Sequence, residues 1–441
     1  MKIHLLVALV FCLLPAFVPA QSTPMVQANN KTSQKTMDGF MNLRFGMFIH
    51  WGPVTLRGTE IGWSRGNQVP VKEYDNLYKE FDPVLFNADE WVKTAKNAGM
   101  KYLTITAKHH DGFCLWPTAF TEHNIMHSQY KKDIVGELAK ACKKQGIKFC
   151  IYFSVLDWYD PNYPIHLPDG KEIDPKANMD KFENVIMKGE LKELVTRYHP
   201  YMLWFDGNWE KPWTQRYAVE MYKYLKHLDP NLIINNRLGK GDHTKMTSTS
   251  VGDYATPEQK IGTLNMKDPW ETCMTICHQW AWKPNDEMKS LQECIQTLVK
   301  TSGGNGNLLF NVGPMLDGRM EARQIHRLKE MGDWLKIYGE SIYNTKGGPY
   351  APNDTVATTR KGNKLFVHVF SNKSGALRLP AMAGAKILQA HFIRGAKVSF
   401  TQETNGDVVI SLPAQLPDEN DSVIELDLNS NAENIPVIAM Y

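Results

Sequence analysis

Three carboxylates in this sequence, each close to aromatic residues, could do chemistry. Asp206 ends the apolar segment LWFD, where a buried carboxylate costs free energy unless it is hydrogen-bonded, paired or used. Glu258 lies in the motif DYATPEQ, and Glu271 lies in the motif PWETC. Two carboxylates that flank one bond suit glycoside cleavage, in which one is the nucleophile and the other is the acid and then the base.

The three carboxylates are not equal candidates. Asp206 is the better candidate for the nucleophile because it ends an apolar strand. Glu258 is the candidate acid/base, since a loop residue after Pro257 can overhang a site, and Glu271 competes for this role. Structural interpretations remain open: Asp206 could cap the turn at Gly207, and Glu271 could be a structural carboxylate.

Other polar and aromatic residues follow the ends of predicted strands, where a barrel has its active site. Histidine and arginine can hold sugar hydroxyls, and tryptophan can form the walls. The candidates of this kind are His50, His109, His110, Trp158, Arg237, Trp280 and Trp282. His50 could also be a core histidine. His109 and His110 could bind a metal, but there is no H-E-x-x-H motif and no clear third ligand. We therefore expect no metal and no other cofactor.

Apolar strand segments alternate with amphipathic helices between residues 45 and 313. Strands are expected at 45–52, 102–107, 148–154, 201–206, 231–236 and 307–313, with weaker ones near 250–254 and 273–278. Helices are expected at 87–100, 132–146, 180–198, 214–228, 287–302 and 319–339. Continuously apolar strands are typical of parallel sheets buried on both faces. About eight strands favour a (β/α)8 barrel, and no G-x-G-x-x-G motif supports a dinucleotide-binding sheet.

The pattern changes after about residue 345 to short alternating strands separated by Gly, Asn and Pro, which indicates an antiparallel β-sandwich. We therefore predict an α/β fold with a (β/α)8-like, TIM-type barrel at 21–345 and a small C-terminal antiparallel β-sandwich domain at 346–441. Six cysteines follow Cys12, all within apolar patterns, and we expect buried free thiols.

The first residues resemble a secretory signal peptide. Lys2 precedes an apolar stretch, and Val18-Pro19-Ala20 forms an A-x-A-like cleavage site, so residues 1–20 are predicted to be removed. The stretch is too short to span a membrane comfortably. We expect an exported protein, periplasmic or secreted. It would be lysosomal if the source is eukaryotic, an alternative that the N-x-S/T sequons leave open.

The overall charge excludes some classes of partner. The formal net charge is only +3, which does not indicate nucleic acid or a membrane surface as the main partner. No later segment is long and apolar enough to be a membrane span. The sequence leaves the oligomeric state open.

Six motifs together resemble one known family. They occur in this order: RFGMFIHWG, YLTITAKHHDGFCLW, LWFDGNW, DYATPEQ, PWETCMTI and GNGNLLFNVGP. They are similar to motifs of glycoside hydrolase family 29, the α-L-fucosidases. The resemblance covers nearly all of the chain after the signal. It implies a barrel with a C-terminal β-sandwich and a retaining exo-α-L-fucosidase that needs no metal. Such an enzyme hydrolyses terminal α-L-fucosyl residues of fucosylated oligosaccharides or glycoconjugates through a covalent fucosyl-enzyme intermediate.

The resemblance also implies roles for single residues. Asp206 matches the nucleophile, and Glu258 matches the acid/base, with Glu271 as a rival. The residues expected to contact fucose are His50, Trp63, His109, His110, Trp204 and Arg237. Trp280 or Trp282 is expected to form an aromatic wall against the C5 methyl group, and Trp158 is a further sugar-binding candidate.

The sequence departs from the family pattern at two positions. Gly62 precedes Trp63 where many relatives have Glu, and either Glu60 reaches in from nearby or a hydroxyl contact is absent. Phe153 stands where a second Tyr is frequent, which removes a phenol near the nucleophile. A catalytically inactive fucose- or glycan-binding relative of the same fold is the alternative function. The presence of Asp206 with two candidate acids argues against it.

Overall fold

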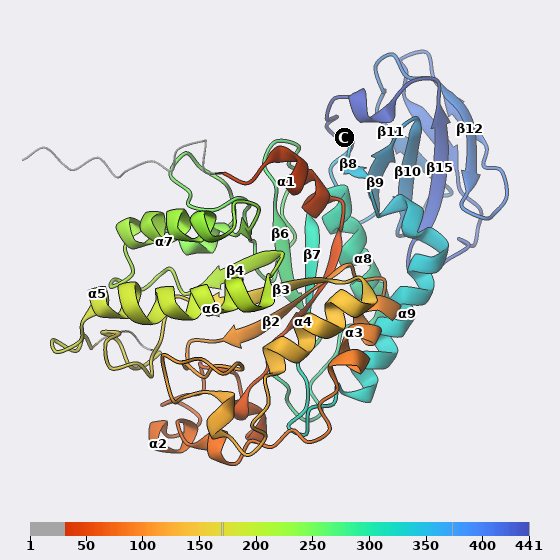
Figure 1. The fold of residues 1–441 in the computed structure, drawn as a ribbon. Helices are drawn as coiled ribbons and strands as arrows, with labels where there is room; N and C mark the ends of the chain where they lie inside the picture. Colours follow the sequence, from red (N-terminus) through yellow and green to blue (C-terminus); the bar gives the residue numbers. More distant parts are fainter. Residues whose placement is uncertain (1–30, 169, 171, 373, 441) are drawn as a thin grey trace, which may run out of the picture.

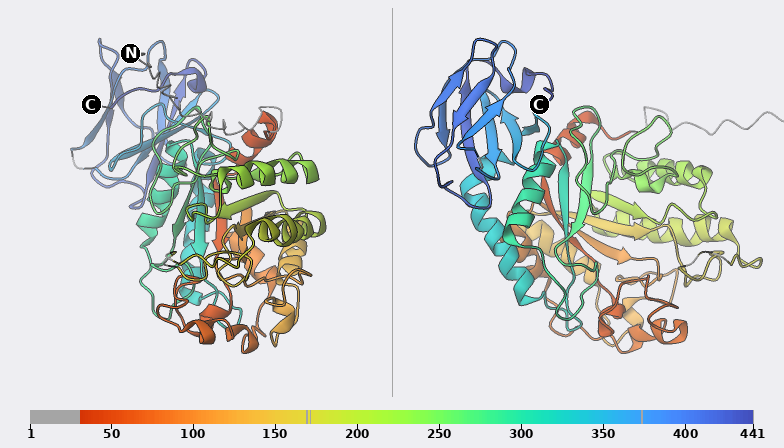
Figure 2. Two further views of the ribbon diagram at one scale, coloured as in Figure 1. Left: turned by 90° about the vertical axis from the view of Figure 1, so that its left-hand side faces the viewer. Right: turned by 180° about the vertical axis from the view of Figure 1, so that it is seen from behind.

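The protein has an α/β domain followed by antiparallel β-sheets (Figures 1 and 2). The structure is a computed structural model that describes residues 31–168, 170, 172–372 and 374–440. The predicted signal peptide lies outside the described residues. Figure 1 shows the C-terminal sheets beside helices α8 (Leu291–Gly303) and α9 (Ala322–Tyr338).

Seven parallel strands form the central sheet, in the order β5-β4-β3-β2-β1-β7-β6. Their bounds are β1 Phe45–Ile49, β2 Tyr102–Lys108, β3 Lys148–Ser154, β4 Met202–Asp206, β5 Ile233–Ile234, β6 Glu271–Thr275 and β7 Asn307–Val312. Strands β1, β2 and β7 are buried at every residue. The predicted burial of both faces of this sheet is therefore confirmed.

The ring of strands is not eight regular strands. The weak strand predicted near 250–254 is wrong, and the one predicted at 231–236 shrinks to the two residues of β5. Residues 254–258 instead fill the gap between β5 and β6 through isolated parallel bridges, such as Glu258 to Cys273. Gly252 has φ +143°, and an added Cβ would lie 2.4 Å from the Asn235 carbonyl oxygen. Pro257 also lacks an N–H for a ladder, so a regular strand cannot form here.

Helices cover the outside of the sheet, close to their predicted positions. They are α3 Ala88–Asn97, α4 Ile134–Gln145, α6 Lys188–Tyr198, α7 Gln215–Leu228, α8 and α9. Local signals explain their ends: Asn87 caps α3 by accepting the Glu90 N–H, and Gly146 ends α4 in the left-handed region. The helix predicted at 180–198 begins as α5 (Met179–Lys181) and passes through a π-helical turn, Phe182–Met187, into α6.

One short helix that the sequence pattern did not reveal lies against the amino-terminal end of the barrel. This helix, α1 (Gln34–Met41), buries Met37 and Phe40. The Phe40 ring lies 5.9 Å from the Tyr102 ring and 5.0 Å from the Tyr254 ring, between ring centroids. The contacts place α1 below the strand ends opposite to those where a barrel binds its substrate.

Two antiparallel sheets follow the barrel, as the sequence predicts. One has the order β12-β15-β10-β9-β8 and the other the order β11-β14-β13. Their bounds are β8 Lys346–Gly347, β9 Val356–Lys361, β10 Lys364–Val369, β11 Ala376–Leu379, β12 Ile387–Phe392, β13 Phe400–Gln402, β14 Val408–Ser411 and β15 Ser422–Leu428. They share one apolar core, while Phe366 and Phe370 belong to the barrel core. The predicted fold class is thereby confirmed.

The cysteines and the helices bear on two further expectations. All six cysteines from Cys114 to Cys294 are buried free thiols, as predicted. In the part of the chain that the structure describes, none of the helices combines the length and apolar character needed to span a bilayer.

Candidate active site

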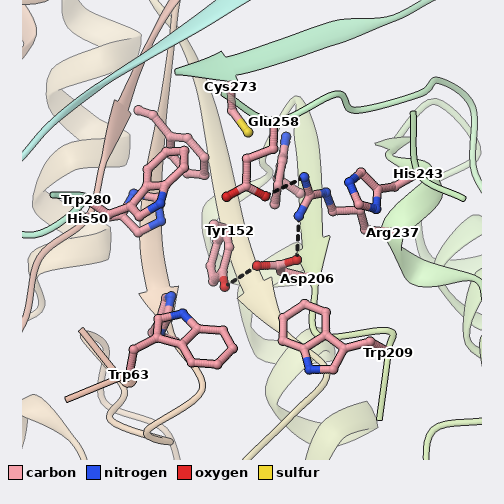
Figure 3. A pocket seen from close by; sticks show the side chains of 13 residues that line it. His50, Trp63, Tyr152, Asp206, Trp209, Arg237, His243, Glu258, Cys273 and Trp280 are labelled. Atoms are coloured by element: carbon pink, nitrogen blue, oxygen red, sulfur yellow. Dashed lines mark hydrogen bonds and ion pairs between the residues drawn. The ribbon is translucent and has the colours of Figure 1, made fainter. Parts of the chain in front are cut away.

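A pocket of about 250 Å³ opens among the strand ends and the loops that follow them (Figure 3). Its lining is mostly aromatic, with two carboxylates and one guanidinium. The lining residues are Phe48, His50, Trp63, His109, Tyr152, Trp204, Asp206, Trp209, Arg237, His243, Glu258, Cys273 and Trp280. Strands β1, β3, β4 and β6 each contribute at least one of them, as the barrel topology requires.

Asp206 ends β4 and points into this pocket. Its Oδ1 accepts a hydrogen bond from Arg237 Nη1 at 2.9 Å, and its Oδ2 accepts one from the Tyr152 hydroxyl at 3.2 Å. Burial opposes the charged form, but Arg237 and His110 outweigh it and hold the pKa of the Asp206 carboxyl below its usual 3.8. Asp206 is therefore an ionised carboxylate at neutral pH, the form that a nucleophile needs.

Arg237 joins the two carboxylates of the pocket. It lies on the 3₁₀ turn Asn236–Leu238 after β5 and donates from Nη2 to Glu258 Oε2 at 2.8 Å. The same guanidinium donates to the Thr256 side chain and carbonyl oxygen, and it lies 4.8 Å from the Trp204 ring centroid. One rigid planar group thus sets the spacing of Asp206 and Glu258 (Figure 3).

Three histidines lie beside the carboxylates. Burial lowers the pKa of His50 to about 3 and that of His110 to about 4, and it lowers the pKa of His109 well below its usual value. All three imidazoles are therefore neutral at neutral pH. His50 Nδ1 pairs with the Asn311 side chain at 2.7 Å, and His110 Nδ1 pairs with the Ser154 hydroxyl at 2.7 Å. His109 also lines the pocket, and its Nδ1 is buried without a protein partner.

The tryptophans of the pocket differ in depth. Trp204 is buried, and its ring stacks on Tyr152 with centroids 5.6 Å apart. Trp63 and Trp209 are 40% and 46% exposed, and their rings stack on each other with centroids 5.9 Å apart. The pocket thus has aromatic side chains both within it and at its mouth.

Four predicted site residues do not line the pocket, and they are His110, Trp158, Glu271 and Trp282. Glu271 is fully buried and accepts hydrogen bonds from Tyr102, Trp204 and Tyr254, and burial raises its pKa to about 7. Trp158 is also fully buried, behind Trp63 and His110, and it donates to Glu210 Oε1. Trp280 lines the pocket but Trp282 does not. The remaining predicted site residues are all brought together there.

The two departures from the family pattern have structural explanations. Glu60 does not line the pocket, because its carboxylate accepts the backbone N–H groups of Trp280 and Ala281 at 2.8 and 2.9 Å. A Cβ at Gly62 would lie 2.8 Å from His109 Nδ1, so a larger residue does not fit. Phe153 packs under the Lys108 ammonium group, while its neighbour Tyr152 supplies a phenol to Asp206.

Sequence reasoning missed five lining residues: Phe48, Tyr152, Trp209, His243 and Cys273. Tyr152 could have been found, since it pairs with Trp204 across β3 and β4 and so shares its face. Trp209 lies in the same motif as Asp206. His243 follows an irregular turn and has no periodic signal. Within the described ranges, no group of three or more His, Cys, Asp or Glu side chains is arranged to hold a metal ion.

Comparison with known proteins agrees with this geometry. A family model described as alpha-L-fucosidase matches residues 15–340. The mouse tissue alpha-L-fucosidase is 29% identical over 91% of this chain and 92% of its own length. The human plasma alpha-L-fucosidase is 31% identical over 75% of each chain.

Solved structures agree as well. A family 29 alpha-L-fucosidase of Bacteroides thetaiotaomicron, solved as a trapped covalent intermediate, superposes with a TM-score of 0.84. It is 29% identical, over 92% of this chain and all of that one. The isoenzyme 1 of Paenibacillus thiaminolyticus has a TM-score of 0.82 at 32% identity, over 90% and 99% of the two chains. The chain therefore belongs to the α-L-fucosidases of glycoside hydrolase family 29.

Proposed function

We propose that this α-L-fucosidase removes terminal α-L-fucosyl residues from fucosylated oligosaccharides or glycoconjugates with retention of configuration. Asp206 is the nucleophile and Glu258 is the acid/base. The observation that carries the proposal is the single guanidinium of Arg237, which holds both carboxylates against one small pocket. The covalent intermediate trapped in the Bacteroides relative supports the same mechanism.

In the first step Asp206 attacks the anomeric carbon as the bond to the leaving oxygen breaks. Glu258 donates its proton to that oxygen, and the departing group leaves as an alcohol. The fucosyl group is then an ester of Asp206. In the second step Glu258 removes a proton from water, which attacks the anomeric carbon and frees Asp206. Two inversions give net retention.

The neighbours of Asp206 suit both its free carboxylate and the fucosyl ester. Arg237 and the Tyr152 hydroxyl stabilise the carboxylate before attack and after release. The neutral imidazoles of His50 and His109 line the pocket, and a neutral ring nitrogen can accept from a sugar hydroxyl, which a charged imidazolium could not do. Sugar recognition and charge stabilisation are thus divided between different side chains.

The mouth of the pocket suits a sugar as the leaving group. Trp63 and Trp209 expose ring surface there, and exposed apolar surface beside a pocket marks a ligand site. The flat C–H face of a second sugar ring can stack on these rings. Within the pocket, Trp280 is the aromatic wall for the C5 methyl group, since Trp282 does not line it.

The test compares the native enzyme with Asp206→Gly on an aryl α-L-fucoside and on a panel of fucosylated glycans. We expect the native enzyme to release fucose that appears first as the α anomer by NMR. Asp206→Gly should lose about 10⁴-fold or more of kcat, because no other group can form the ester. Added azide should restore turnover and give β-L-fucosyl azide, the product of one inversion.

Other outcomes would contradict the proposal. Initial release of the β anomer would indicate an inverting enzyme. Fucose binding without turnover by the native chain would support the inactive sugar-binding relative instead. Full activity of Asp206→Gly would exclude Asp206 as the nucleophile.

We also propose that the chain is exported and reaches a periplasmic, secreted or lysosomal location. The basis is the basic residue, apolar stretch and A-x-A-like site of residues 1–20. Mass spectrometry of the protein recovered from its source should find a mature amino terminus at Gln21. An intact Met1 on the functional protein would contradict the proposal.

A further inference from the structure

The carboxylate of Glu271 lies beneath the pocket and belongs to none of the steps above. Glu271 is the first residue of β6, so it lies at the end of the strand opposite to the substrate side. It is fully buried, and its Oε1 accepts the Trp204 indole N–H at 3.1 Å. The hydroxyls of Tyr102 and Tyr254 also donate to it. All three partners are donors that converge on one carboxylate.

The Trp204 ring lies between the Glu271 carboxylate and the groups that contact Asp206 and Glu258. The Arg237 guanidinium lies 4.8 Å from the Trp204 ring centroid, and the Tyr152 ring stacks on the indole with an interplanar angle of 17°. Arg237 in turn donates to Asp206 and Glu258, and Tyr152 donates to Asp206. The orientation of one indole ring therefore affects both groups that hold the catalytic carboxylates.

We propose that Glu271 is a positioning residue, which fixes the Trp204 indole in the orientation that seats Arg237 and Tyr152 against Asp206 and Glu258. The proposal rests on the roles proposed above for Asp206 and Glu258. The indole N–H is a donor only, and in a buried site it must find an acceptor. Glu271 supplies that acceptor, so other orientations of the ring would leave the N–H unpaired.

Glu271 is badly placed to be the acid/base itself. A proton donor must reach the leaving oxygen directly at about 2.6–3.2 Å or through one water molecule. Glu271 does not line the pocket, and the Trp204 side chain that does so is hydrogen-bonded to it. Both of its oxygens are already occupied by donors from within the barrel. Glu258, by contrast, lines the pocket.

Two variants separate a positioning role from an acid/base role. Glu271→Gln keeps an oxygen for the Trp204 N–H, and its amide N–H can donate to the Tyr102 hydroxyl, which can also accept. Glu271→Leu removes the acceptor. We expect Glu271→Gln to stay within about threefold of the native kcat. Glu271→Leu should lose about tenfold to a hundredfold in kcat with a smaller change in KM, the cost of a misplaced catalytic geometry.

The controls use Glu258→Ala and Trp204→Phe in the same assays. Azide should restore turnover to Glu258→Ala, in which the acid/base is missing, but not to Glu271→Leu. Trp204→Phe removes the indole N–H, so adding Glu271→Gln to it should change kcat by less than about twofold. This pair keeps the proposal testable if Glu271→Leu does not fold.

Three results would overturn the inference. The first is a Glu271→Gln enzyme as inactive as Glu271→Leu and restored by azide, which would make Glu271 the acid/base. The second is an unchanged kcat in Glu271→Leu, with only the melting temperature lowered, which would make it a structural carboxylate. The third is a large additional loss of kcat when Glu271→Gln is combined with Trp204→Phe. If azide fails to restore turnover to Glu258→Ala, the proposed acid/base role of Glu258 is contradicted. The kcat values of the Glu271 variants would still test the positioning role.

Discussion

The two arcs of the barrel are built differently. One arc consists of β7, β1, β2, β3 and β4, whose strands are five to seven residues long and pair in ladders of four or more residues, with one register shift between β2 and β3. The other arc consists of the two-residue β5, the segment 254–258 and β6, and its first two members are joined to their neighbours mainly by isolated bridges. In the second arc side chains add to the backbone hydrogen bonds, since Asn235 bonds to the backbone of Phe205 and Asp253 accepts the Ile234 N–H.

The proposed catalytic groups are divided between these arcs. Asp206 belongs to the regular arc, and its side chain is 14% exposed, whereas Glu258 belongs to the irregular arc with its side chain 36% exposed. Arg237 follows β5 and contacts both. A nucleophile gains from a fixed backbone, because a small displacement is costly. The proposed acid/base lies in the irregular arc, where loops can change without disturbing the proposed nucleophile.

Replacement of Glu258 by Ala tests the irregular arc and should cause a larger loss of activity than the substitutions of Arg237 and Trp209 described below. General acid and base catalysis contributes about 10²–10⁴-fold, so kcat/KM on a fucosylated glycan should fall by that factor. On α-L-fucosyl fluoride the first step needs little acid, so kcat/KM should fall much less. With added azide, the Glu258→Ala enzyme should form α-L-fucosyl azide, the product with retained configuration. NMR of the product checks this.

The matched control for Glu258 is Glu287→Ala, an exposed carboxylate on another loop. It should leave kcat/KM within about twofold, as expected for a surface substitution. Equal losses on the glycan and the fluoride in Glu258→Ala would contradict an acid role for Glu258.

Replacement of Arg237 by Lys tests the connection between the two arcs. A lysine keeps the charge but cannot donate to both carboxylates from one planar group. We expect kcat to fall about tenfold to a hundredfold, with the same factor on the glycan and the fluoride because the nucleophile is affected. The control Arg216→Lys, an exposed arginine of α7, should have no measurable effect. A loss confined to the glycan would show that Arg237 serves Glu258 alone.

The same difference between the arcs decided what the sequence could predict. Strands β1 to β4 are continuous apolar segments between helices with clear caps, so their positions were confirmed. The strand predicted near 250–254 was wrong, because Gly252 and Pro257 exclude a ladder there while the flanking residues remain apolar. Hydrophobic pattern reports burial, and burial alone does not make a strand.

The depth of a side chain within the barrel was the second feature that the sequence could not predict. Alternation along a strand shows which side chains point inward but not at which level they lie. Asp206 ends its strand and Glu271 begins one, so the two carboxylates lie in different layers. Trp158 and Trp209 are a similar pair, since both follow strand ends but one is buried and the other exposed. Long-range packing decides between them, and one sequence does not show it.

Replacement of Trp209 by Ala should have the smallest effect, because Trp209 lies at the mouth after β4 and its ring contacts are with Trp63 and His110, not with the two proposed catalytic carboxylates. Loss of one stacking contact of about 0.5–1.5 kcal/mol corresponds to about a twofold to tenfold higher KM for a fucosylated oligosaccharide. The KM for α-L-fucosyl fluoride should not change, since fluoride has no ring to stack. Trp209→Phe keeps a ring and should stay close to the native KM. An equal rise for both substrates would mean that Trp209 acts on the fucose pocket through Trp63 or His110 and not on the leaving group.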